Sequence, residues 1–151
     1  MIRQHDAKRD TQRVAIRRSG GGEAFTTPLA ESTVPAGFPS PADDSREELD
    51  FTAHVVRNPE STFFLRVSGE SMTGAGIFHG DLLVVDRSLE PCSGDIVIAV
   101  LDGEFTVKRL RRRGSRVELL PENPRFRKIV LQEESTLEIW GVVTGAYKSF
   151  R

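Results

Sequence analysis

From Thr62 onward the chain is a series of short β-rich runs separated by turn residues, and this series constrains the fold more than any other feature. The runs span residues 63–67, 82–85, 96–100, 105–107, 117–120, 129–131 and 137–143. Runs of this length that are rich in Val, Ile and Phe and end at Gly, Asn or Pro are typical of β-strands. The dipeptide Asp102-Gly103 supplies the positive φ angles of a tight hairpin turn. The sequence therefore predicts a mainly β fold, with a compact, strongly bent antiparallel β body.

Residues 1–45 differ in composition, and we expect them to form an extended or disordered, flexible N-terminal arm. Four prolines between Thr27 and Pro41 oppose helix, and Gly20-Gly21-Gly22 is a flexible break. The segment up to Arg18 is basic, and the simplest interpretation of it is a solvated, disordered tail. The sequence leaves the role of residues 1–22 open.

The remaining residues, 46–151, we expect to form one β domain. Leu49, Ala53 and Val56 have helical spacing, which predicts that a short helix over residues 46–57 precedes the strands.

Composition excludes several classes of protein. A net charge of −1 argues against a general nucleic-acid or membrane binder, although the charge is unevenly distributed. The single cysteine, Cys92, allows no intrachain disulfide and fits a reducing cytoplasm. No apolar run approaches the roughly 18 residues of a membrane span, and the N-terminus has no apolar core of a signal peptide. We expect a cytoplasmic protein without metal or cofactor, because no cysteine or histidine cluster is present.

Ser71 is the first candidate for chemistry. It follows the run at 63–67 in the Gly-flanked turn Ser68-Gly69-Glu70-Ser71-Met72-Thr73-Gly74. Catalytic groups often lie on such loops, where backbone N–H groups can stabilise an oxyanion. Taken alone, a serine between glycines is usually a plain turn residue.

Lys108 is the candidate base. In a strand it shares a face with Thr106 and Leu110, so it can point into the domain. Burial lowers the pKa of a lysine and can leave it neutral enough to accept a proton. On spacing alone, a surface lysine that opens a basic run up to Arg116 is the simpler interpretation. The histidines lie in contexts typical of surface or capping residues, so a Ser-Lys dyad explains the chain better than a Ser-His-Asp triad.

The bond between Ala36 and Gly37 is a candidate cleavage site. Its flanking prolines, Pro35 and Pro39, favour an extended backbone, and two small residues let a nucleophile approach closely. The tether to Ser71 is long enough for delivery within one chain. As an isolated dipeptide, Ala-Gly in a proline-rich linker carries no information.

Four sequence blocks closely resemble the LexA/UmuD family of self-cleaving proteins, in order and separation. The blocks are Gly69-Glu70-Ser71-Met72, AGIFHGDLLVVD at 75–86, Gly94-Asp95-Ile96-Val97 and GEFTVKRL at 103–110. The resemblance runs from about residue 33 to the C-terminus. It implies a serine endopeptidase with Ser71 as nucleophile and Lys108 as base, self-cleavage between Ala36 and Gly37, and a mostly β catalytic body.

The resemblance also implies partners. Members of the family form homodimers and cleave themselves when stimulated by RecA filaments on single-stranded DNA. The segment before Gly37 is expected to be too short for a LexA-type DNA-binding domain, so the chain is similar to the UmuD branch. The truncated UmuD form is the accessory subunit of an error-prone translesion polymerase with a UmuC-type catalytic subunit, in SOS mutagenesis. No direct sequence-specific DNA binding is expected, because the arm shows no recognition helix.

Three alternatives stay open. The first is a LexA-like or phage-type transcriptional regulator that self-cleavage inactivates. The second is a protease that acts on other proteins, for which a membrane anchor would be expected. The third is a structural β domain with an inactive site.

Overall fold

A computed structural model describes residues 26–30, 33–38, 41, 44–131 and 135–151. These residues form two antiparallel sheets, of two and seven strands. The small sheet contains β1 (Thr26–Ala30) and β2 (Arg46–Asp50), and the helix α1 (Phe51–Val55) follows β2. The strands of the large sheet are β3 (Thr62–Arg66), β4 (Leu82–Asp86), β5 (Ile96–Leu101), β6 (Glu104–Arg113), β7 (Arg116–Leu120), β8 (Ile129–Val130) and β9 (Leu137–Tyr147).

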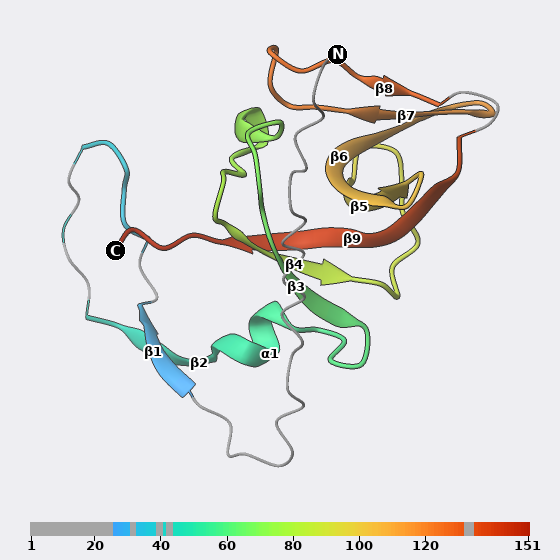
Figure 1. The fold of residues 1–151 in the computed structure, drawn as a ribbon. Coiled ribbons are helices and arrows are strands. Elements are labelled where there is room, and N and C mark those ends of the chain that lie inside the picture. Colours follow the sequence, from blue (N-terminus) through green and yellow to red (C-terminus); the bar gives the residue numbers. More distant parts are fainter. Residues whose placement is uncertain (1–25, 31–32, 39–40, 42–43, 132–134) are drawn as a thin grey trace.

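The large sheet confirms the prediction of an antiparallel β body. Its strand order is β3-β4-β9-β5-β6-β7-β8, and each of its strands corresponds to one of the β-rich runs. Figure 1 shows β9 passing through the middle of the molecule, with β7 and β8 at one end and β3 and β4 at the other. The expected hairpin joins β5 to β6, where Asp102 and Gly103 both have positive φ angles, of 48° and 84°.

The strong bend of the body comes from β9. Its pairing shifts register against β4 between Val84 and Val85, and against β5 between Ile98 and Ala99. Such bulges bend a strand and increase its twist. At the second bulge Gly141 lies against β4, where an added Cβ would be 2.7 Å from the Val85 side chain. The glycine therefore allows β4 and β9 to approach closely.

Two clusters of buried residues form the core. One contains Val67, Met72, Ile77, Leu83, Val85 and Ile98. The other contains Val97, Ala99, Leu110, Leu119 and Val142. Val97 and Ile98 are consecutive on β5 and belong to different clusters, because successive side chains of a strand point to opposite faces. The first cluster includes Met72 and Ile77, so the loop after β3 is packed into the core.

The predicted helix over residues 46–57 was wrong in its first half. Residues 46–50 form β2, which pairs with β1 from Thr26↔Asp50 to Ala30↔Arg46. The helix is confined to α1, where the Asp50 side chain accepts a hydrogen bond from the N–H of Ala53 at 2.9 Å. Residues 46–50 gain inter-strand hydrogen bonds to β1, a partner that the weak helical spacing does not indicate.

The small sheet and α1 lie at the lower left of Figure 1, apart from β7 and β8 at the upper right. The basic segment up to Arg18 lies outside the described residues. Within the described ranges, no helix is long and apolar enough to cross a membrane.

Candidate active site

Ser71 lies on the loop between β3 and β4, and this loop is fixed at both ends. At its base the N–H of Val67 donates to Asp81 O and the N–H of Gly80 donates to Val67 O, both at 2.9 Å. Met72, directly after Ser71, is 1% exposed and belongs to the core. Because its neighbour is buried, the Ser71 side chain has a defined position although it lies on a loop.

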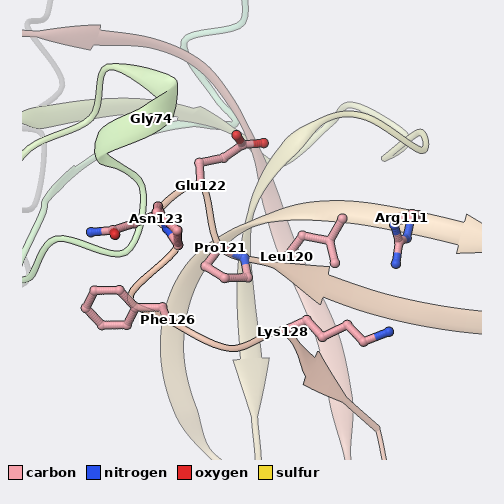
Figure 2. A pocket seen from close by; sticks show the side chains of 9 residues that line it. Gly74, Arg111, Leu120, Pro121, Glu122, Asn123, Phe126 and Lys128 are labelled. Atoms are coloured by element: carbon pink, nitrogen blue, oxygen red, sulfur yellow. The ribbon is translucent and has the colours of Figure 1, made fainter.

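The segment after β7 holds the same loop from its other side. The N–H of Glu122 donates to Ser71 O at 2.8 Å, and the N–H of Gly74 donates to Glu122 O at 2.6 Å. The Asn123 side chain donates to Glu70 O at 2.8 Å. A Cβ on Gly74 would lie 2.4 Å from Glu122 O, so the two backbones approach this closely only because residue 74 is glycine. Figure 2 shows Gly74 beside Glu122 and Asn123.

Lys108 reaches Ser71 from the middle of β6, where it pairs with Val97 of β5. Its Nζ lies 2.9 Å from Ser71 Oγ, 2.8 Å from Thr106 Oγ1 and 3.0 Å from Val107 O. The residue is 8% exposed. The interior-facing lysine expected from strand alternation is therefore present, and the alternative of a surface lysine was wrong.

The surroundings of Lys108 favour its neutral form. Burial lowers the pKa of its amine below the ordinary value of 10.5. None of the ion pairs among the described residues involves Lys108, so no carboxylate there offsets the cost of burying its charge. A neutral amine has two N–H donors and one lone pair. Thr106 Oγ1 and Val107 O can accept the two donors, which leaves the lone pair directed toward the Ser71 hydroxyl.

The loop also carries donors for an oxyanion. Among the described residues, no hydrogen-bond acceptor contacts the backbone N–H groups of Glu70, Ser71 and Met72. N–H groups fixed beside a nucleophile can stabilise the negative charge of a tetrahedral intermediate. The site thus combines a hydroxyl, a desolvated amine and backbone N–H donors, which are the groups that acyl transfer needs as nucleophile, base and oxyanion donors.

The structure does not bring the Ala36–Gly37 bond to this site. Residues 33–38 lie in the connection between β1 and β2 and are exposed, with Val34 at 90% and Phe38 at 94% exposure. A Cβ added at Gly37 would have no atom within 4 Å. The bond is therefore exposed to solvent, and its cleavage by a Ser71 side chain would require the connection to move.

Sequence reasoning missed three residues of the site. Thr106 was placed on the Lys108 face, but its hydrogen bond to the amine was not anticipated. Glu122 and Asn123 were not singled out, although they fix the loop that carries Ser71. The sequence signal beside them is the Asn-Pro pair at 123–124. This pair predicts a turn but does not indicate that the turn contacts the Ser71 loop. His79 lies in a turn, and its Nδ1 accepts a hydrogen bond from Gly69 N at 3.2 Å.

The chain is similar to known proteins over most of its length. A family model described as Peptidase S24-like matches residues 28–144. Protein SamA of Salmonella typhimurium is 52% identical over 120 residues, which cover 79% of this chain and 83% of the relative. Protein ImpA of Escherichia coli is 48% identical over 126 residues, 82% of this chain and 85% of the relative. A LexA repressor of Syntrophotalea carbinolica is 40% identical over 134 residues, 89% of this chain and 65% of the relative.

Proposed function

Because the chain belongs to the peptidase S24-like family, we propose that Ser71 and Lys108 are its catalytic dyad and that it cleaves itself between Ala36 and Gly37. The chain is a self-cleaving serine peptidase, UmuD-like, with a function in SOS mutagenesis. The observation that carries the proposed dyad is the 2.9 Å contact between Lys108 Nζ and Ser71 Oγ, made by an amine that the fold buries.

The proposed reaction begins when neutral Lys108 accepts the proton of the Ser71 hydroxyl as Oγ attacks the carbonyl carbon of Ala36. The tetrahedral intermediate collapses when the protonated amine gives this proton to the nitrogen of Gly37, which leaves with its chain. An ester then joins Ser71 to Ala36. Water, deprotonated by Lys108, hydrolyses this ester and returns the serine hydroxyl. The products are residues 1–36 and 37–151.

The experiment that tests this proposal is intact-mass analysis of the purified chain. It is incubated at alkaline pH, and separately at neutral pH with RecA, single-stranded DNA and an ATP analogue. We expect a fragment that begins at Gly37. Ser71→Ala and Lys108→Ala should each nearly abolish the fragment, because the two residues act as a unit. Lys108→Arg should also fail, because a guanidinium keeps its proton in this pH range.

A different new N-terminus, or undiminished cleavage by Lys108→Ala, would contradict the proposed dyad and bond. Thr52→Ala is a matched control, because this exposed residue lies on α1, outside the dyad.

We propose that residues 46–151 act as the peptidase domain and that residues 1–45 carry the cleavage site. SOS mutagenesis implies partners of the RecA and UmuC kinds in general. In detail, we propose a homodimer whose cleavage is stimulated by a RecA filament on single-stranded DNA. The truncated form would then serve a UmuC-type translesion polymerase in the cytoplasm. Exposed, unpaired Cys92 is consistent with a reducing compartment.

The proposed role of cleavage is to uncover a surface that residues before Gly37 had covered, so that the dimer changes partner. A chain that begins at Gly37 should then support damage-induced mutagenesis without RecA-stimulated cleavage, and full-length Ser71→Ala should not. Equal mutagenesis from both would show that cleavage is not the switch. The LexA-like alternative is less supported, because that relative is 40% identical against 52% for SamA.

A further inference from the structure

Positive charge is concentrated on one part of the β body. Residues 109–128 contain eight Arg and Lys residues against two Glu, in a chain whose net charge is −1. This segment includes the second half of β6, all of β7 and the loop that leads to β8. None of these cations belongs to the neighbouring dyad, and apart from Arg109, which pairs with Glu122, the peptidase chemistry does not explain them.

The register of β6 and β7 places two arginines opposite each other. Arg113 pairs directly with Arg116 across the Gly114-Ser115 turn, and Arg111 pairs with Glu118. Strand alternation puts these four side chains on one face of the sheet. Two like charges directly opposite destabilise a strand pair. A bound polyanion would remove this repulsion.

The two glutamates neutralise little of the charge. Glu118 accepts from Arg111 at 2.6 Å and from Lys128 at 2.9 Å, so one carboxylate is shared by two cations. Glu122 pairs with Arg109. Five further arginines are exposed and have no ion pair within the described part of the chain; they are Arg112, Arg113, Arg116, Arg125 and Arg127.

An open groove of about 590 Å³ adjoins this charged face, and Figure 2 shows its lining. Arg111 and Lys128 lie on one side of it and Phe126 on the other. Phe126 is 43% exposed and stands between Arg125 and Arg127 in the chain. An exposed aromatic ring among cations is the combination by which proteins bind single-stranded nucleic acid, with bases stacked on the ring and phosphates on the cations.

We propose that the face formed by Arg111, Arg113, Arg116, Phe126 and Lys128 binds single-stranded DNA without sequence preference. The guanidinium groups contact phosphates, for which their planar fork is suited. The Phe126 ring stacks on a base at the groove. Gly74, three residues after Ser71 in the same loop, also lines this groove, so a strand of DNA bound in the groove would contact the loop that carries Ser71. This binding requires no cleavage and does not rest on the proposed function.

The test uses the full-length Ser71→Ala chain, which cannot lose residues by the proposed reaction. Fluorescence anisotropy measures its binding to a labelled oligothymidine of about 20 nucleotides, at about 50 mM and about 200 mM salt. Arg113→Glu/Arg116→Glu should weaken binding about tenfold or more and flatten the dependence on salt, because phosphate contacts release counterions. Phe126→Ala should weaken binding about fivefold or more without changing that slope.

Two matched charge reversals are the controls. Arg46→Glu/Arg57→Glu changes two exposed arginines of β2 and the α1–β3 connection and should leave the affinity unchanged. Arg17→Glu/Arg18→Glu changes the basic N-terminal segment. Binding lost only in this last variant, or equally in all three double variants, would overturn the proposal. So would no binding at either salt, or displacement of the oligonucleotide by polyglutamate at equal charge concentration, which would point to an acidic protein surface instead.

Discussion

The N–H of Glu122 donates to the carbonyl oxygen of Ser71 at 2.8 Å, while the Glu122 carboxylate pairs with Arg109. Arg109 directly follows Lys108 on β6. Glu122 therefore joins the loop that carries the proposed nucleophile to the strand that carries the proposed base. This connection helps to position Ser71 Oγ at 2.9 Å from Lys108 Nζ, within the hydrogen-bond reach that the proposed general base needs.

We expect Gly74→Ala to impair cleavage strongly. The new Cβ would lie 2.4 Å from Glu122 O, so the loop must move away from residues 122–123. Such overpacking costs about 1–3 kcal/mol of unfolding free energy, and a displacement of about 1 Å at the nucleophile can slow cleavage by about 100-fold. Denaturant unfolding and the rate of self-cleavage measure the two effects. Gly145→Ala is the control, because its Cβ would make only an ordinary 4.0 Å contact with Val84.

The strands and the β5–β6 hairpin could be predicted from sequence because their signals are local. Asp102-Gly103 specifies its turn whatever surrounds it. The connection between Glu122 and Ser71 could not be predicted, since it joins backbone groups 51 residues apart and uses no distinctive side chain. The helix over residues 46–57 failed for a similar reason. Its first half pairs with β1, a partner that the spacing of Leu49 and Ala53 does not reveal.

We expect Lys108→Met to stabilise the fold in the Ser71→Ala chain. Burial lowers the pKa of Lys108, so the unfolded chain binds this proton more tightly than the folded chain. The charged lysine therefore destabilises the fold most below its folded-state pKa, and the penalty disappears as the pH rises from that value toward the ordinary 10.5. The advantage of Lys108→Met in unfolding free energy should shrink over the same interval. A difference that stays constant from neutral to alkaline pH would contradict a depressed pKa.

The cleavage rate of the natural chain gives a second measure of the folded-state pKa of Lys108. If neutral Lys108 is the base, the rate should climb with pH and level off at its folded-state pKa. The midpoint of this climb should agree with the pH at which the stability advantage of Lys108→Met begins to shrink. Two unrelated midpoints would mean that another group limits cleavage.

Asp86 should make the fold sensitive to acid. Burial raises its pKa, but hydrogen bonds from Asn58, Ser88 and Ser61 outweigh burial and lower it to about 2. The stabilisation is complete above the ordinary pKa of 3.8 and is lost as the pH falls toward 2. Asp86→Asn replaces one carboxylate oxygen, which accepts hydrogen bonds, with an NH2 group that can only donate them. We expect the variant to lose about 1–3 kcal/mol of unfolding free energy near neutral pH. Its unfolding free energy should also fall less steeply in acid than that of the parent.

Exposed Asp44 offers a matched control, because Asp44→Asn should change the unfolding free energy by less than about 0.5 kcal/mol. Equal acid sensitivity of the parent and Asp86→Asn would show that Asp86 does not govern it.

Lys148→Met should destabilise the loop that follows Ser71. The Lys148 amine donates to Gly76 O at 3.0 Å and pairs with Asp81, which is 6% exposed. Burial raises the pKa of Asp81, but the hydrogen bonds from Lys148 and Phe78 and the charge of Lys148 outweigh burial. The net effect lowers the pKa below its ordinary value, so the carboxylate is ionised. Without Lys148 a buried charge loses its counterion, and we expect a loss of about 1–3 kcal/mol in unfolding free energy.

A double-mutant cycle measures the coupling between the two side chains. Because the pair acts as a unit, Lys148→Met/Asp81→Asn should lose less unfolding free energy than the sum of the two single variants. Additive losses would mean that the two side chains stabilise the loop independently.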